Sequence, residues 1–315
     1  MKKCNFLLMA LFIGLLIQSC SNDDNLSSGN EEKNARLSID VTDAPIDNAE
    51  VQACFVTISE IYLDGVEVEG FTSTTVDLLA YQNGDTYKLG DFNVDAKSYS
   101  SIDLKLTPES NNNNVHPHGC YILDSDGNAH ALLANETIVT LASDIETSES
   151  SNTNLVLDFD LRKCIKKEES NNDNYDFVSR TKLETAIRVS SKEDSHIKGE
   201  CSSVVDYSDE IIVYVYNKGE FNAETEMKVD SETNLQFTNA VSSSKVDSNN
   251  KFQLSFLQEG EYELHFYGYD EDEKGQLEMK GKLQVQSQTN LLNLTNLEIS
   301  SQSNLDLSLL ILGIG

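Results

Sequence analysis

The chain has 315 residues, a formal net charge of −30 and an apolar content of 39%, so it is long and apolar enough to build the cores of two ordinary domains. Its strong negative charge disfavours binding to nucleic acid and to anionic membrane surfaces. The absence of tryptophan weighs against a module that stacks sugars on that side chain, although 12 Tyr and 12 Phe are available in its place.

The first nineteen residues have the layout of an export signal. Lys2 and Lys3 precede a run from Phe6 to Ile17 that is almost entirely apolar. The run is shorter than the roughly 20 apolar residues that cross a bilayer, and it has the length of the hydrophobic part of a signal peptide. We therefore expect residues 1–19 to be a signal peptide.

Cys20 follows this segment in a pattern that resembles a bacterial lipobox. Ile17 lies three residues before the cysteine and the small residue Ser19 lies directly before it. The resemblance implies that Cys20 becomes the lipid-bearing N-terminus and that the chain binds the membrane through this lipid. An ordinary secretory signal with a chance cysteine is the alternative.

Residues 20–35 are polar and rich in Asn, Ser, Asp and Glu, so we expect a disordered tether there. Ser21 occupies the position where, by resemblance to the usual sorting rule, aspartate would retain a lipoprotein in the inner membrane. The pair Asp23-Asp24 resembles the short acidic signals that bring lipoproteins of one Gram-negative phylum to the cell surface. We expect anchoring in the outer membrane, facing the cell exterior, although a solvated tether also explains the two aspartates.

Four more cysteines follow in the chain: Cys54, Cys120, Cys164 and Cys201. In an exported protein they permit two disulfides in three connectivities, and buried free thiols are the alternative. No two of them have the close spacing typical of zinc sites. We expect neither a metal site nor a cofactor.

From residue 36 to residue 190 the dominant hydrophobic period is two, which is typical of half-buried strands. Leu37, Ile39 and Val41 alternate with polar residues, and Asp158 and Asp160 alternate with apolar neighbours, so both aspartates are predicted to face solvent. One helix is predicted over 160–169. The other predicted strands are 51–59, 74–79, 98–106, 136–142, 154–160 and 181–190.

A polar stretch over 191–199 marks the predicted start of a second domain, 191–315. Phe252, Leu254 and Phe256 alternate before a short connection with Gly260, which predicts a hairpin. Residues 309–315 are predicted as an edge strand or a frayed tail. The other predicted strands are 196–201, 210–216, 226–229, 251–257, 261–268, 276–286 and 294–299. The predicted fold class is thus all-β, with two antiparallel β-sandwich domains in tandem after a signal peptide and a flexible tether.

Several short motifs of the first domain, 36–190, occur in the order and spacing of a known family. They include Thr42-Asp43-Ala44-Pro45, Val76-Asp77-Leu78-Leu79, Leu157-Asp158-Phe159-Asp160 and Thr185-Ala186-Ile187-Arg188. Over about residues 34–190 the chain resembles the bacterial family named domain of unknown function 4382. The resemblance implies an exported β-sandwich and supplies no catalytic site. One departure is Ala96-Lys97, where the family usually has Ala-Gly.

The second domain resembles the transthyretin-like, carboxypeptidase-regulatory-like sandwich. The family's D-x-x-G-x-F turn corresponds to Asp247-Ser248-Asn249-Asn250-Lys251-Phe252, in which Asn250 replaces the glycine. Asparagine is the best substitute for glycine in the left-handed conformation. The resemblance implies an appended rigid module.

Two motifs contain residue types that bind metals. His116-Pro117-His118-Gly119-Cys120 is interpreted as a turn that enters a strand. Asp124-Ser125-Asp126-Gly127-Asn128 resembles a fragment of a calcium loop without the remaining ligands, so a turn closed by aspartate hydrogen bonds is preferred.

No nucleophile elbow, zinc-protease motif or phosphate-binding loop is present, so no catalytic residue is predicted and we do not expect an enzyme. The expected function is that of a non-catalytic cell-envelope lipoprotein with a binding or structural role. The alternatives are a glycan- or ligand-binding module of a surface uptake or adhesion system, with a glycan or protein as partner, and a hydrolase with an unrecognised site. Exposed Tyr or Phe side chains clustered at one end would favour glycan binding, and a buried carboxylate pair in a cleft would favour the hydrolase.

Overall fold

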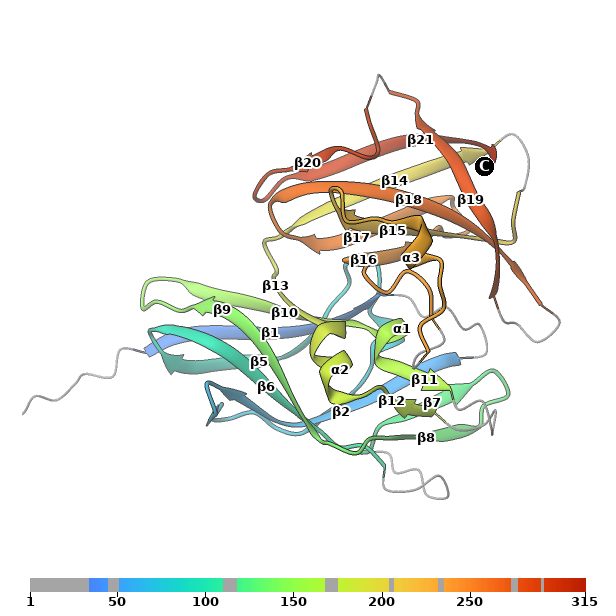
Figure 1. Cartoon of the computed structure of the whole chain (residues 1–315). Helices are drawn as coiled ribbons and strands as arrows, with labels where there is room; N and C mark the ends of the chain where they lie inside the picture. The colour runs from blue at the N-terminus through green and yellow to red at the C-terminus, as the bar shows by residue number, and fades with distance from the viewer. Residues whose placement is uncertain are drawn as a thin grey trace, which may run out of the picture. The chain divides into compact units, whose positions relative to one another are not determined.

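The computed structural model describes residues 34–44, 51–109, 118–167, 175–203, 207–231, 235–272, 277–289 and 292–315 (Figure 1). The predicted signal peptide, Cys20 and most of the predicted tether lie outside these residues. Asn34 and Ala35, which the prediction placed in the tether, are the first residues of strand β1 (Asn34–Ala44). Within the described residues, no helix is long and apolar enough to cross a membrane.

The structure is built almost entirely of β-strands, which confirms the predicted all-β fold class. The first sheet has four strands in the order β13-β10-β1-β5. β13 is Ile187–Ser191, β10 is Asn152–Asp160 and β5 is Tyr87–Asp95. β1 and β10 run parallel over nine residue pairs, so the sheet is mixed rather than purely antiparallel.

The second sheet has the order β11-β12-β8-β7-β2-β6-β9, with β3 and β4 also paired to β2. Its long central strand is β2, Val51–Leu63. The other strands are β3 (Val66–Glu67), β4 (Thr74–Asp77), β6 (Ser98–Leu106), β7 (Tyr121–Asp124), β8 (Ala129–Leu133), β9 (Ile138–Glu146), β11 (Ile165–Lys167) and β12 (Tyr175–Phe177).

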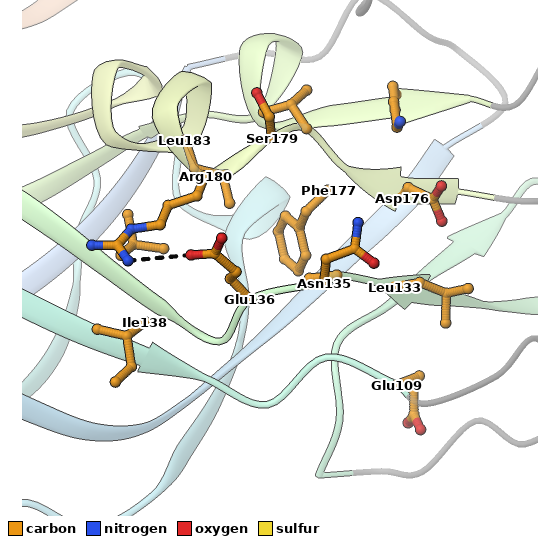
Figure 2. Close-up of a pocket in the computed structure, with 14 residues that line it drawn as sticks. Glu109, Leu133, Asn135, Glu136, Ile138, Asp176, Phe177, Ser179, Arg180 and Leu183 are labelled. Atoms are coloured by element: carbon orange, nitrogen blue, oxygen red, sulfur yellow. Dashed lines mark hydrogen bonds and ion pairs between the residues drawn. The ribbon is translucent and has the colours of Figure 1, made fainter.

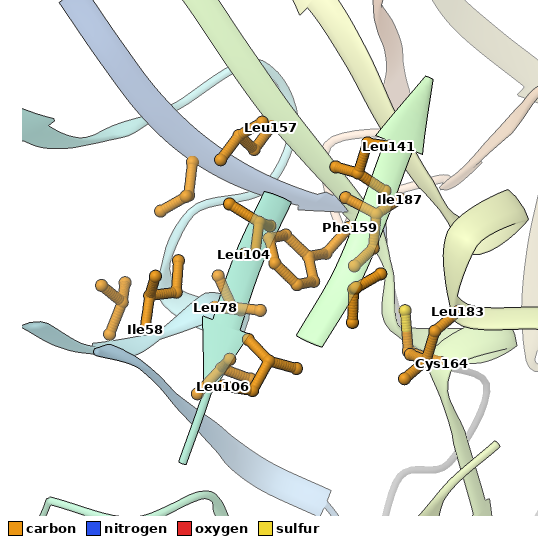
Figure 3. Close-up of a cluster of buried hydrophobic side chains, with 14 of the residues drawn as sticks. Ile58, Leu78, Leu104, Leu106, Leu141, Leu157, Phe159, Cys164, Leu183 and Ile187 are labelled. Carbon is orange, nitrogen blue, oxygen red and sulfur yellow. The ribbon is translucent and has the colours of Figure 1, made fainter. Parts of the chain in front are cut away.

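These two sheets enclose one hydrophobic core, which Figure 3 shows in part. Leu157 and Phe159 of β10 point into it, and Leu104 and Leu106 of β6 meet them from the other sheet. Leu37, Ile39 and Val41 of β1 are fully buried, as their alternation predicts. We call residues 34–191 the first sandwich.

Helices are few and short: η1 (Leu78–Ala80), α1 (Leu161–Cys164), α2 (Arg180–Ala186) and α3 (Ala223–Glu226). The helix predicted over 160–169 is wrong for residues 165–167, which form β11, and residues 168 and 169 lie outside the described part of the chain. The strand predicted over 181–190 is wrong in its first half, where α2 buries Leu183 and Ala186. Both segments are too short for their periodicity to distinguish helix from strand.

The third sheet contains the remaining strands in the order β16-β15-β18-β19-β21-β14-β17, with β20 on β18. β19 pairs with β18 through its first half and with β21 through its second half, so it joins two layers around a second core. We call residues 195–314 the second sandwich. Its strands are β14 (Ser195–Ser203), β15 (Glu210–Asn217), β16 (Ser242–Lys245), β17 (Lys251–Leu257), β18 (Gly260–Glu271), β19 (Leu277–Ser287), β20 (Leu297–Ile299) and β21 (Asn304–Ile314).

The hairpin predicted around Gly260 is wrong, since β17 pairs with β14 and β18 pairs with β15, β19 and β20. Phe252 of β17 instead contacts Phe266 of β18 edge-to-face across the core, with ring centroids 5.7 Å apart. The left-handed residue before this connection is Phe256, with φ of 56°, and not Gly260. An alternating burial pattern is the same whether two strands pair within one layer or face each other from two layers.

Two further predictions in this part of the chain are wrong. The strand predicted over 226–229 does not form, because the chain makes α3 and a turn there. The end of the chain is neither an edge strand nor a frayed tail, because β21 lies between β14 and β19. Leu307, Leu309 and Ile311 of β21 belong to the second core.

Candidate functional site

The most highly charged buried region of the described chain lies at the end of β10, where the first sandwich meets the second. Asp158 and Asp160 were predicted to face solvent, and this is wrong: they are 7% and 6% exposed. Asp158 forms an ion pair with Arg188 of β13, and Asp160 forms ion pairs with Arg162 and Lys163 of α1. The alternation correctly placed both carboxylates opposite the core, but that second face of the strand is covered as well.

Arg162 is the most deeply buried cation of this cluster, with a side-chain exposure of 0%. Its guanidinium donates to the carbonyl oxygens of Gln236 and Phe237 at 3.1 and 3.3 Å. It also lies over the ring of Tyr214, 5.1 Å from the centroid. Burial alone would raise the pKa of Asp160, but the positive charges of Arg162 and Lys163 outweigh this effect and lower it.

Two more cations of the first sandwich bind backbone carbonyls of the second. Arg188 donates to the oxygens of Phe256 and Ser255 at 2.9 and 3.2 Å. Lys163 donates to the oxygen of Ala240. Arg162 and Lys163 follow Asp160 within three residues, and Arg188 ends the motif Thr185-Ala186-Ile187-Arg188. Neither signal predicted that these cations pair with the two aspartates.

Asp43, in the Thr-Asp-Ala-Pro motif of β1, is buried beside this cluster. It accepts hydrogen bonds from the Leu161 N–H and the Gln82 amide at 3.1 and 3.2 Å. Burial raises the pKa of Asp43 well above its ordinary value despite these hydrogen bonds, and the charges of Asp160 and Asp158 raise it further. The cavity beside it has about 10 Å³, which is room for one water molecule and not for a substrate.

A larger pocket of about 440 Å³ opens in the first sandwich between the start of β9, β12 and α2 (Figure 2). Ile138, Phe177 and Leu183 form its apolar wall. Arg180 lies at the pocket, and its guanidinium nitrogens pair with the carboxylate oxygens of Glu136 and Glu184 at 3.2 and 2.7 Å. Arg180 and Glu136 are exposed, Glu184 is half-buried, and these three charges compensate one another.

The turn between β7 and β8 is closed by hydrogen bonds to Asp124. Asp124 Oδ1 accepts from the N–H groups of Asp126 and Asn128 at 3.0 and 2.8 Å, which confirms the predicted turn closed by aspartate hydrogen bonds. Asp124 Oδ2 lies 2.7 Å from His130 Nε2. This contact and the backbone hydrogen bonds lower the pKa of Asp124.

The turn between β16 and β17 has the same construction. Asp247 Oδ1 accepts from the N–H groups of Asn249 and Lys251, both at 2.8 Å. Asn250 has a φ of 62°, so the left-handed conformation predicted for it is confirmed.

Cys54, Cys120, Cys164 and Cys201 are all buried free thiols, so of the two alternatives for these residues the structure has the one without disulfides. Burial raises the pKa of Cys120 and of Cys201 to about 12, which makes both thiols poor nucleophiles.

The described residues contain no group of three or more His, Cys, Asp or Glu side chains placed to hold a metal ion. His116 and Pro117 lie outside the described part, which resumes at His118. No Phe or Tyr among the described residues is among the exposed large hydrophobic side chains, so the aromatic cluster that would favour glycan stacking is not found there.

No curated protein matches the chain. Among solved structures, the Bacillus anthracis TIE protein is 12% identical over 88% of this chain, with a TM-score of 0.18, and the chain spans 34% of its length. BcpA, the major pilin subunit of Bacillus cereus, is 10% identical, with 90% and 71% of the two chains covered and a TM-score of 0.22. A candidate adhesin from Bacteroides ovatus is 10% identical, with 84% and 86% covered and a TM-score of 0.18. At these TM-scores the similarities support no conclusion about function.

The family comparison is more informative. Residues 34–179 match the family described as a domain of unknown function, DUF4382. The match ends at Ser179, directly before α2 and eleven residues before the predicted boundary at residue 190, so it does not include the motif Thr185-Ala186-Ile187-Arg188. It confirms the family resemblance predicted for the first part of the chain.

Proposed function

We propose that the chain is a non-catalytic lipoprotein of the cell envelope with a binding or structural role. Residues 1–19 would be removed as a signal peptide, and the lipid on Cys20 would hold the protein in the outer membrane. The residues between Cys20 and β1 would connect this anchor to the sandwiches. One acyl chain binds a membrane only marginally, whereas two or more hold a protein there stably.

The non-catalytic role is supported by the buried charged side chains at the end of β10, because all of them are engaged in structural contacts. Arg162, Lys163 and Arg188 neutralise Asp158 and Asp160 and donate to backbone carbonyls of the second sandwich. Such contacts fix one element against another. A catalytic group, in contrast, has to reach a reacting atom and to exchange a proton with it.

A hydrolase would find a buried carboxylate pair in Asp158 and Asp160, but Asp160 is not suited to act as its general acid. A general acid requires a raised pKa, and the pKa of Asp160 is lowered. Asp43 has a raised pKa, but its cavity admits no substrate. These two observations favour the binding or structural role over the hydrolase.

We also propose that residues 191–315 form a separate transthyretin-like domain that acts as a rigid appended module. The turn at Asp247 supports this assignment, since it has the hydrogen bonds and the left-handed residue that the family motif implies. The end of β13 at Ser191 and the start of β14 at Ser195 are consistent with a boundary near residue 191.

Substitution of the lipidated cysteine tests the anchor. Cys20→Ala should move the protein from the membrane fraction to the soluble fraction and abolish labelling by a fatty-acid probe. Cys4→Ala is the matched control, because Cys4 lies within the segment that would be removed, and this variant should remain labelled. Labelling of Cys20→Ala would disprove lipidation at this residue.

Protease treatment of intact cells tests the orientation. A chain that faces the cell exterior should be degraded by added protease, while a periplasmic control protein survives. Survival of the chain until the outer membrane is broken would place it on the periplasmic side.

A further inference from the structure

A polar cleft of about 730 Å³ lies beside the buried charges, between β9, β10 and β13 of the first sandwich and residues 238–242 of the second. We call Asp158, Asp160, Lys163 and Arg188 its floor. The side chains of these four residues are 9%, 9%, 15% and 24% exposed. Their positions are fixed by ion pairs and by hydrogen bonds to backbone carbonyls, so the floor is rigid before any ligand arrives.

The floor retains hydrogen-bonding capacity that the described residues do not use. Lys163 Nζ contacts the oxygen of Ala240 and Asp160 Oδ2, which occupy two of its three N–H groups. Asp158 is bound through Oδ2, and Oδ1 of Asp160 has no hydrogen-bond partner in the described structure. Because this oxygen of Asp160 is buried, one N–H group of Lys163 and one carboxylate oxygen of Asp158 remain for a ligand at the base of the cleft.

The rim of the cleft adds one exposed carboxylate, that of Asp144, and several uncharged polar groups. Ser143 of β9 and Thr185 of α2 contribute hydroxyl groups, and Gln258 contributes an amide. Ala142, an exposed residue of β9, lies on the same wall and leaves it open. The lining contains no aromatic side chain, so it offers hydrogen bonds rather than a stacking surface.

We propose that this cleft binds a neutral saccharide through its hydroxyl groups. A hydroxyl group both donates and accepts, so sugar hydroxyls can donate to the free oxygen of Asp158 and accept from Lys163. The proposal rests on the binding role proposed above and names its ligand class. A volume of about 730 Å³ falls within the usual range of small-molecule sites.

The charges of the floor select against ionic ligands. Both carboxylates of the floor are already neutralised by a neighbouring cation, so a charged ligand would have to break an existing ion pair there. The exposed carboxylate of Asp144, also in the lining, repels anions. A metal ion would lie next to the ammonium of Lys163 and the guanidinium of Arg188, which repel it. A neutral polyol uses the remaining hydrogen bonds and leaves the ion pairs intact.

Calorimetric titration of the full chain, purified in detergent, tests the proposal. The probes are the neutral disaccharides maltose, cellobiose, xylobiose and mannobiose, with galacturonic acid and glutamate as charged comparisons. We expect saturable binding of at least one neutral sugar and none of the charged compounds. Absence of saturable binding by every neutral sugar, or stronger binding of a charged compound, would overturn the proposal.

Two variants and a control place the binding in the cleft. Ala142→Trp should fill the cleft and weaken sugar binding at least tenfold, and Gln258→Ala should weaken it severalfold without filling space. Ala129→Trp, at an exposed position of β8 away from the cleft, should bind like the unaltered chain. If all three variants bind the sugar equally well, the sugar binds outside the cleft. This result does not depend on Cys20, so failure of sugar binding and failure of membrane anchoring are distinguishable.

Discussion

At the scale of single residues, two aspartates close together in space have opposite electrostatic environments. Asp160 lies beside Arg162 and Lys163 and has a lowered pKa, whereas Asp43 has no cation among the causes that shift its pKa, and its pKa is raised by burial. The difference determines which carboxylate stabilises the folded chain at neutral pH. Asp160 does so as an ion, and Asp43 is most favourable when it is protonated.

Asp43→Asn should therefore change how stability depends on pH. The raised folded-state pKa of Asp43 means that its contribution is fully present below its unfolded pKa of about 3.9 and is lost as the pH rises through the folded value. The variant stays neutral at this position. The difference between its free energy of unfolding and that of the unaltered chain should therefore shift in favour of the variant as the pH rises from 4. Urea unfolding between pH 4 and pH 8 measures this shift. Asp126→Asn, at an exposed position, should follow the unaltered chain, and a parallel profile for Asp43→Asn would contradict the prediction.

The sequence predicts these residues only in part. The alternation of Leu157 and Phe159 with Asp158 and Asp160 identified the face of β10 that builds the core. It could not show that the opposite face is covered too, because the groups that cover it, such as the carbonyl oxygens of Ser255 and Phe256, come from about a hundred residues further along the chain. A backbone carbonyl leaves no signature in the sequence.

At the scale of elements, local chemistry was predicted better than pairing. The turn at Asp247 forms as the motif implies, because an aspartate that caps two N–H groups and an asparagine in the left-handed conformation act within six residues. The pairing of β17 was not predicted, since its partner β14 lies some fifty residues earlier. The alternating apolar pattern that places Phe252 against Phe266 across the core is the same pattern that a hairpin would have.

Asn250 allows a direct test of this turn. Asn250→Ala should lower the free energy of unfolding by about 1–2 kcal/mol, because alanine at a φ of 62° has its Cβ too close to the backbone. Asn250→Gly should stay within about 1 kcal/mol of the unaltered chain, since glycine has no Cβ. Urea unfolding of both variants and of Ser248→Ala, an exposed neighbour in the turn, measures the difference. Equal effects of alanine and glycine at position 250 would refute the conformational explanation.

At the scale of the whole described chain, polar contacts of differing burial couple the two sandwiches. Arg162 and Arg188 both extend from the first sandwich to carbonyl oxygens of the second, and Lys182 pairs with Asp230 across the same boundary. Asn83 and Ser244 add a hydrogen bond of 3.3 Å. These contacts favour unfolding of both sandwiches together.

Removal of the two arginines should uncouple the sandwiches. Breaking a buried ion pair costs about 3–5 kcal/mol, so Arg162→Ala combined with Arg188→Ala should divide a single calorimetric transition into two. The matched control combines Arg180→Ala with Lys280→Ala. These cations are 42% and 40% exposed and pair within one sandwich, where each pair contributes about 1 kcal/mol or less. Two transitions in the unaltered chain would show that the contacts do not couple unfolding.

The parallel pairing of β1 with β10 has a mechanical consequence if the chain is anchored at Cys20. Tension would enter at the N-terminal end of β1 and leave through the C-terminal end of β10, which continues directly into Arg162. In parallel strands these two ends lie at opposite ends of the ladder. A pull would therefore shear all nine residue pairs at once instead of opening them one after another, so the strand nearest the anchor resists force with its whole ladder.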